Sequence, residues 1–305
     1  MRRVLGWIFK ALAALAAYVL LVAAWYALVP DVKGLAKANP GKTAFMLYRE
    51  DQWAREGRKT ALKWKWAPLS SMSPALVRAV LISEDDKFWG HEGFDFDAMR
   101  EALRKDVEEG RLRAGGSTIS QQLAKNLWLS PSKSPMRKIK EAVLAWRLER
   151  ELSKKRILEI YLNVVEWGDG IFGAEAASRA HFGVSASGLS AEQAVRLAVS
   201  LPNPLRYDPA GNSGFVRKRA AIILSRLQRR GYQPPPPPSS PPSADFRKAE
   251  EGSAAKTAAV PSAPVPSAPP AAEAERDRQE DAVVREALDW VRQNVEQGGE
   301  APAGE

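Results

Sequence analysis

The pattern of apolar and polar residues begins with a long uncharged run near the amino end. No charged residue occurs in residues 11–30, whereas Arg2, Arg3 and Lys10 precede them. At about 1.5 Å per helical residue, this run can cross a hydrocarbon layer of about 30 Å. The basic amino end predicts that this end lies inside and the bulk of the chain outside. A cleaved signal peptide is the alternative, but the run exceeds a typical signal core, so we expect residues 1–30 to be a cytoplasmic stub and uncleaved anchor.

The central part of the chain repeats apolar positions with a helical period, which predicts a mainly α fold. Helix starts are predicted where a capping residue or a proline precedes an apolar run, at Ser73-Pro74, Asp95, Ser117 or Thr118, Ser134-Pro135 and Ser190. Helix ends are predicted at Gly110, Leu152, Pro202 and Gly231. In the helix after Ser134-Pro135, the expected apolar stripe consists of Met136, Ile139, Val143 and Trp146.

Composition divides the chain further. Residues 31–72 form a polar segment with scattered tryptophans. We interpret it as a membrane-proximal connecting segment in which the tryptophans are partly buried. The alternative is that these tryptophans belong to a surface that faces lipid. Residues 73–232 carry the helical pattern of a catalytic domain. Residues 233–305 are rich in Pro, Ala and Ser, which predicts a disordered tail. Within that tail, residues 273–296 could form a short charged helix.

Charge and cysteine content narrow the function classes. The 305 residues carry a formal charge of +9 and no cysteine. A disulfide, a thiolate metal site and a cysteine nucleophile are therefore excluded. The positive net charge is compatible with an anionic partner, such as nucleic acid, anionic lipid or a pyrophosphate group. No finger or RNA-recognition motif appears in the sequence, so we expect no nucleic-acid partner.

Two motifs carry the candidate chemistry. The first is Glu84-Asp85-x-x-Phe88-x-x-His91-x-Gly93, placed at the end of a predicted helix. A carboxyl group there faces the unfavourable end of the helix dipole, which raises its pKa and suits a general base. The second is Gly115-Gly116-Ser117-Thr118-Ile119-x-Gln121-Gln122-x-x-Lys125-Asn126. Its glycine turn leads into a helix start, where free N–H groups bind anions.

These two motifs, in this order, resemble the signature of the family-51 peptidoglycan glycosyltransferases, and the monofunctional biosynthetic subgroup in particular. Three later stretches are similar to the remaining motifs of the family, namely Arg137-Lys138-x-x-Glu141, residues 154–163 and residues 172–183. His181 stands where the family often has tyrosine, so we expect a structural histidine there. Asn163 is expected to be a polar anchor at a helix end.

The resemblance implies a lysozyme-like helical domain with a smaller membrane-proximal lobe. It implies polymerisation of lipid II into β-1,4-linked glycan strands, with inversion at the anomeric carbon and release of undecaprenyl pyrophosphate. The enzyme would therefore act in cell wall biogenesis and in maintaining cell shape. Glu84 would be the general base and Glu141 the second acidic residue. Lys125 and Arg137, with Lys133 and Lys140 in support, would bind the pyrophosphate. The other expected substrate-binding residues are Asp85, Phe88, His91, Ser117, Thr118, Gln122 and Asn126.

The resemblance also sets expectations for ligands, partners and location. It leaves room for a divalent cation, Mg²⁺ or Mn²⁺, on the pyrophosphate, with no certain protein ligand and no organic cofactor. The expected partners are lipid II, the growing lipid-linked strand and the membrane, with wall-synthesis and division proteins as further candidates. The chain would be a single-pass inner-membrane protein with its catalytic domain in the periplasm.

Transpeptidase activity is not expected. The S-x-x-K letters at residues 130–133 and 253–256 are followed by no Lys-Thr-Gly. A lysozyme-like hydrolase would also use two carboxylates, but it has no need for a cation cluster or an anchor. An inactive scaffold is the non-enzyme alternative, although both motif glutamates are present.

Overall fold

The computed structural model describes residues 2–109, 115–131 and 134–232 of the chain. The predicted tail at 233–305 with its short helix, the helix end at Gly110 and Lys133 lie outside these residues. The described part is mainly helical, as predicted. Its α-helices are α1 (Arg2–Leu28), α2 (Ala44–Arg55), α3 (Pro74–Glu84), α4 (Phe96–Glu109), α5 (Ile119–Trp128), α6 (Pro135–Glu151), α7 (Lys154–Val164), α8 (Ala174–Phe182), α9 (Ala191–Ser200) and α10 (Gly214–Arg229).

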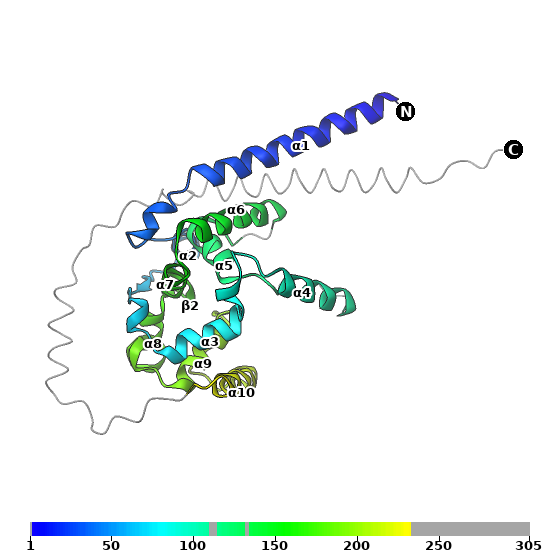
Figure 1. The fold of residues 1–305 in the computed structure, drawn as a ribbon. Coiled ribbons are helices and arrows are strands. Elements are labelled where there is room, and N and C mark those ends of the chain that lie inside the picture. Colours follow the sequence, from blue (N-terminus) through cyan, green and yellow to red (C-terminus); the bar gives the residue numbers. More distant parts are fainter. Residues whose placement is uncertain (1, 110–114, 132–133, 233–305) are drawn as a thin grey trace, which may run out of the picture.

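Helix α1 extends well beyond the body of the molecule (Figure 1). In the described residues, one candidate span, Gly6–Ala36, is long and apolar enough to cross a membrane, and none of its most apolar stretch is buried. The carboxyl end of α1 is fixed to α6, since Arg147 Nη1 donates to the carbonyls of Tyr26 at 3.3 Å and Pro30 at 2.7 Å. This single apolar helix is compatible with a membrane anchor.

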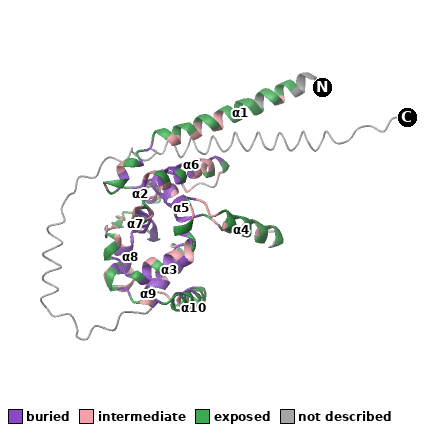
Figure 2. Ribbon diagram, viewed as in Figure 1, coloured by how far each residue is buried: buried purple, intermediate pink, exposed green. Residues whose placement is uncertain are grey.

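The hydrophobic core lies among α3, α5, α7 and α9, with α6 and α10 packed outside them. Figure 2 shows the buried residues concentrated in these central helices, while α1 and α4 are largely exposed. Leu76 of α3, Leu123 of α5 and Leu158 of α7 are fully buried. Burial of such side chains contributes about 1.5–3 kcal/mol each, so the elements that carry the two motifs are held by the core itself.

A small sheet has the strand order β1-β3-β2, where β1 is Lys63–Trp64, β2 is Glu166–Gly168 and β3 is Ile171–Phe172. Strand β1 runs parallel to β3, and β2 runs antiparallel to β3. The sheet therefore joins the 31–72 segment to the chain after α7. Trp53 is buried, and Trp64 and Trp66 pack partly buried against the core, which agrees with the packing interpretation.

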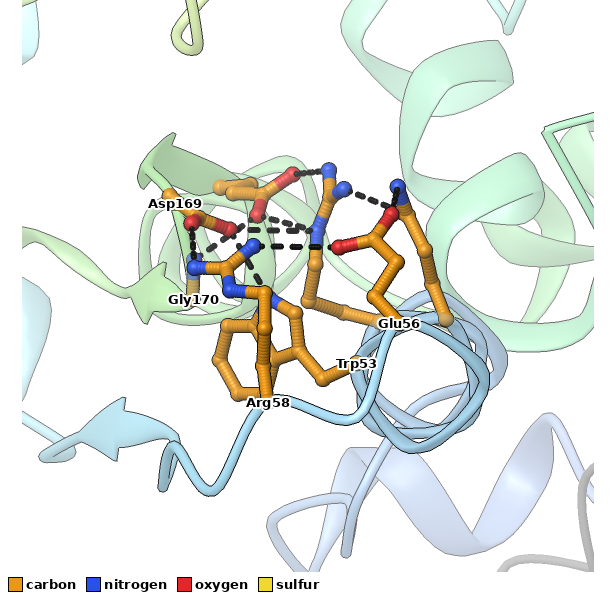
Figure 3. Close-up of polar contacts among 8 residues, drawn as sticks. Trp53, Glu56, Arg58, Asp169 and Gly170 are labelled. Carbon is orange, nitrogen blue, oxygen red and sulfur yellow. Dashed lines mark hydrogen bonds and ion pairs between the residues drawn. The ribbon is translucent and has the colours of Figure 1, made fainter.

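The β2–β3 turn also anchors α2 (Figure 3). Trp53 Nε1 donates to Asp169 Oδ1 at 3.1 Å, and Arg58 pairs with the other oxygen of the same carboxylate. Deeper inside, Arg49 forms a two-bond pair with Glu166, at 2.9 and 2.7 Å. Because both of these side chains are almost fully buried, the pair holds α2 against β2.

Asn163 is the polar anchor that the sequence predicts at the end of α7. Its side chain exchanges two hydrogen bonds of 2.8 Å with the backbone of Ala67, and Trp64 Nε1 donates to its carbonyl at 2.9 Å. The connection between the 31–72 segment and α7 is therefore fully hydrogen-bonded although it is buried.

Most predicted helix starts are confirmed. Capping boxes form at Thr118 and Ser190, and the side chains of Asp95 and Ser134 accept from the N–H groups three residues later. Ser73 is the N-cap residue of α3, as predicted, but its side chain makes no capping hydrogen bond. Helix α3 does begin at Pro74, but the Ser73 hydroxyl donates to the carbonyl of Leu189 at 3.2 Å instead.

The apolar stripe predicted for α6 was wrong in part. Met136 is buried, but Trp146 is exposed, and Ile139 and Val143 are only half-buried. The buried face of α6 instead carries Lys140, Glu141, Leu144, Ala145, Arg147 and Leu148. Two flanking helices explain the difference, since α6 packs against α5 on one side and α1 on another. Contact with α1 turns a partly charged face inward.

Candidate active site

Glu84 is the last residue of α3 and points toward α5. Gln122 Nε2 donates to its Oε2 at 3.1 Å, and the Ser83 hydroxyl lies 3.3 Å from Oε1. Burial raises the pKa of Glu84, and these hydrogen bonds and the charges of Arg219 and Lys125 lower it by a smaller amount. The direction agrees with the sequence-based expectation. The main cause is burial, however, and not the helix dipole.

Asp85 and His91 brace the loop that follows Glu84. His91 Nδ1 accepts from the N–H of Gly93 at 3.1 Å, so its Nε2 carries the proton that it donates to Asp85 at 3.0 Å. The other oxygen of Asp85 accepts from the N–H of Ile119, at 2.9 Å, in the first turn of α5. The side chain of Asp85 is thus committed to joining the two motifs, which sets the distance between Glu84 and α5.

Three further residues expected to bind substrate are buried in this structure. Phe88 is fully buried, and Lys154 Nζ lies 4.4 Å from its ring centre. Thr118 caps α5 and donates from its hydroxyl to the carbonyl of Gly93 at 2.7 Å. Asn126 is buried on α5. The structure gives these residues positions that support the site from inside the fold.

A cluster of cations surrounds Glu141 on α6. Arg137 Nη1 donates to Glu141 Oε2 at 2.6 Å, and Lys138 Nζ pairs with Oε1. Lys138 Nζ also donates to the Ser117 hydroxyl at 3.0 Å, which ties the cluster to the glycine turn of the second motif. Glu141 is buried, so its charge is balanced by these partners rather than by water.

Lys125 links the two acidic centres. Burial lowers the pKa of its ammonium group, the nearby charges of Arg137 and Lys138 lower it further, and Glu141 and Glu84 raise it. Its Nζ lies 5.8 Å from the ring centre of Phe45 on α2, which gives it a cation–π contact. Lys125 is therefore a half-buried cation between the helix end that bears Glu84 and the cluster around Glu141.

Lys140 lies on the buried face of α6 and contacts the end of α1. Its Nζ lies 5.4 Å from the ring centre of Tyr26, at the end of α1. Lys138, which the sequence analysis did not name as a pyrophosphate-binding residue, pairs with Glu141. Lys133 is outside the described residues.

Besides Lys138, two residues of the site were missed as functional candidates. The ring of Tyr161 is buried in the core, and its hydroxyl donates to Gln122 Oε1 at 2.9 Å. Arg219 of α10 is near enough to act on the charge of Glu84. Nothing in the local sequence of α7 or α10 signals either contact, because both depend on how distant helices pack.

A hollow of about 420 Å³ opens beside Glu84, between the end of α3, the start of α4 and the glycine turn. Its lining is mostly acidic and includes Asp86, Asp97 and Glu101. Glu84 thus lies in the wall of an acidic hollow and also near the cation Lys125. A molecule whose anionic end bound the cations could place an uncharged hydroxyl or an anomeric carbon near Glu84.

The described residues form no ready-made cluster of side chains for a divalent metal. Within the described ranges, no three His, Cys, Asp or Glu side chains gather in a way that could hold one. Both oxygens of Glu141 are already paired with cations.

The sequence is similar to those of known proteins. The sequence model of a family described as Transglycosylase matches residues 51–228, which is more than half of the chain. A biosynthetic peptidoglycan transglycosylase of Nitrosospira multiformis is 51% identical over 189 residues, covering 62% of this chain and 82% of the relative. One of Chromobacterium violaceum is 46% identical over 220 residues, covering 72% and 96%, and one of Laribacter hongkongensis is 45% identical over 223 residues, covering 73% and 97%.

Proposed function

Since the chain belongs to the transglycosylase family and is a peptidoglycan transglycosylase by its relatives, we propose that it polymerises lipid II into β-1,4-linked glycan strands and releases undecaprenyl pyrophosphate. Glu84 acts as the general base, and Glu141 holds the cations that receive the leaving group. The observation that carries this proposal is the placement of a buried carboxylate, Glu84, beside Lys125 and next to the Arg137–Glu141–Lys138 cluster.

The base must take the proton of the attacking sugar hydroxyl. Glu84 is suited to this because burial raises its pKa toward neutrality, while Gln122 still donates a hydrogen bond to its charged form. The hydroxyl oxygen then attacks the anomeric carbon of the donor as its proton passes to Glu84. Attack from the face opposite the pyrophosphate inverts the configuration at that carbon.

The leaving group needs positive charge. The bond from the anomeric carbon to the pyrophosphate breaks, and both electrons stay on the phosphate oxygen. Lys125, Arg137 and Lys138 would bind this anion, with the Ser117 hydroxyl beside them. Cations already fixed in a partly buried site stabilise the developing charge without reorganisation during the reaction. A divalent cation that arrived with the pyrophosphate would add to this charge without a protein ligand.

The proposal includes a membrane anchor with the catalytic domain on the periplasmic side. Its support is the exposed apolar helix α1 and the basic residues before it. In spheroplasts the outer face of the inner membrane is accessible, so added protease should digest the catalytic domain. Complete protection of the domain would contradict this orientation.

The proposal also excludes peptide cross-linking by this chain, because the S-x-x-K letters lack a following Lys-Thr-Gly. The reaction is tested by incubating the purified full chain with lipid II and resolving the products by length. We expect long strands that are not cross-linked and stoichiometric undecaprenyl pyrophosphate. Shortening of added glycan would indicate a hydrolase, and no change in either substrate would indicate a scaffold.

A further inference from the structure

A chain of two hydrogen bonds connects α7 with the candidate base. Tyr161 of α7 donates from its hydroxyl to Gln122 Oε1 at 2.9 Å, and Gln122 Nε2 donates to Glu84 Oε2 at 3.1 Å. The three residues lie on α7, α5 and α3, and Gln122 is the middle member. The carboxylate of Glu84 therefore accepts a hydrogen bond from the Gln122 amide, and the same amide accepts a hydrogen bond from Tyr161.

The orientation of the Gln122 amide decides what Glu84 meets. When Nε2 of Gln122 faces Glu84, the amide donates an N–H hydrogen bond to the carboxylate, which favours the charged form of Glu84. With the amide reversed, its oxygen would face the oxygen of Glu84, and this arrangement is favourable only when Glu84 is protonated. A reversed amide would turn its NH₂ group toward the Tyr161 oxygen, and the Tyr161 O–H would lose Gln122 Oε1, the acceptor that it has in this structure. The hydrogen bond from Tyr161 thus selects the orientation that suits a base.

Tyr161 is built to remain a donor. Its ring is fully buried in the core. Burial raises the pKa of the Tyr161 hydroxyl well above its usual value, and the charges of Glu84 and Asp85 raise it further. The hydroxyl therefore keeps its proton at the pH values of the assay and remains able to donate it to Gln122 Oε1.

We propose that Tyr161 is a positioning residue that locks the Gln122 amide so that its N–H group always faces Glu84. This inference rests on the proposed function, in which Glu84 is the base. The lock keeps the buried carboxylate available for proton abstraction at lower pH than burial alone would allow. Tyr161 itself does not touch the reacting groups.

Other charged groups also act on Glu84 and must be held constant in a test. They are Lys125 of α5 and Arg219 of α10, both of which favour the charged carboxylate. Asp85, the next residue, is committed to His91 and Ile119. Because a change at Tyr161 leaves all of these side chains in place, an altered pH dependence would report on the amide.

The central variant is Tyr161→Phe, which keeps the packed ring and removes only the hydroxyl. We expect the acid limb of its pH–rate profile for strand synthesis to move to higher pH by about one unit, with little change in the plateau rate. A hydrogen bond to a charged group has the strength for a shift of this size. The matched control is Tyr232→Phe, which removes a hydroxyl from another buried tyrosine, near Arg78, and should leave the profile unchanged.

A double-mutant cycle separates the lock from a general structural effect. Gln122→Leu should shift the acid limb in the same direction, and adding Tyr161→Phe to it should produce no further shift. If the two shifts were additive, or if Tyr161→Phe alone left the acid limb in place, the proposed lock would be wrong. Circular dichroism of each variant would identify any that fails to fold, and Gln122→Leu alone must then show the shift.

A second readout is independent of activity. Carbon-13 labelling of the glutamate side chains allows the titration of Glu84 to be followed in the full chain, with Glu84→Gln used to assign its signal. We expect Tyr161→Phe to titrate at higher pH than the unmodified chain. An unchanged titration would overturn the lock even if the protein proved inactive on lipid II, whereas a shifted titration in an inactive protein would overturn only the proposed function.

Discussion

The turn between β2 and β3 allows a sharp test of how the fold is held. Gly170 has a φ of +69°, and a Cβ added there would lie under 3.0 Å from two ring carbons of Trp53. That ring is buried and cannot move easily, because its Nε1 donates a hydrogen bond to Asp169 and the guanidinium carbon of Arg58 lies 5.5 Å from the ring centre (Figure 3). The change Gly170→Ala therefore combines two costs.

The first cost is the left-handed backbone, at about 1–2 kcal/mol for a residue with a Cβ. The second is overpacking, typically about 1–3 kcal/mol. We expect Gly170→Ala to lower the free energy of unfolding by about 2–5 kcal/mol, a large fraction of the stability of a typical domain. Gly183 is the matched control, since its φ is +70° and nothing lies within 4 Å of an added Cβ. Gly183→Ala should cost only about 1–2 kcal/mol.

The assay is urea unfolding of the detergent-solubilised chain, followed by tryptophan fluorescence. The difference between the two variants isolates the contact with Trp53, because the backbone cost is common to both. Equal destabilisation by the two changes would refute the packing of Trp53 against the β2–β3 turn. Because α2 also carries Phe45, which contacts Lys125, Gly170→Ala should additionally weaken donor binding.

Two further predictions concern the cation cluster. Glu141→Gln leaves one acceptor oxygen for two cations, so it should lose one of the two hydrogen bonds and the negative charge that balances Arg137 and Lys138. We expect it to lower the free energy of unfolding by about 1–3 kcal/mol and to reduce donor affinity more than Glu84→Gln does; unchanged thermal unfolding and unchanged affinity would contradict this. Lys125→Ala should weaken donor binding by about 10–100-fold while leaving the unfolding midpoint nearly unchanged. Burial lowers the pKa of Lys125, so this side chain should lose its charge at lower pH than an ordinary lysine does, and donor affinity should fall as pH rises through that region. Lys125→Arg should keep its donor affinity over the same pH region. A donor affinity of the unmodified chain that did not change with pH would count against the role of Lys125 in binding pyrophosphate.

Helix starts could be predicted from the sequence where the signal is local. Thr118 and Ser190 cap their helices through residues three positions away, which the sequence displays directly. Ser73 has the same local pattern, but its hydroxyl bonds to Leu189, 116 residues later in the chain. A capping residue that is also buried against a distant strand or loop can satisfy its hydroxyl elsewhere, and no local pattern reveals this.

The same limit applies to the site. Glu84, Lys125 and Glu141 were identified from their motifs, and the structure brings them together, whereas their catalytic roles remain predictions. Lys138 and Lys140 are two positions apart on α6, and packing against α1 decides that Lys140 meets Tyr26 while Lys138 meets Glu141. Periodicity gives the angle between two side chains on a helix, but it does not say which neighbouring helix each one will face.

The central claim is that Glu84 is the base in strand synthesis, and Glu84→Gln tests it most directly. Glutamine retains the shape but cannot take the proton, and a positioned base contributes about 10²–10⁴-fold, or roughly 3–5 kcal/mol of barrier. Glu92→Gln, an exposed change in the following loop, is the matched control. We predict that Glu84→Gln binds lipid II with near-native affinity and forms strands at least about a hundredfold more slowly, while the control is unaffected. Strand synthesis by Glu84→Gln at a near-native rate would contradict the claim.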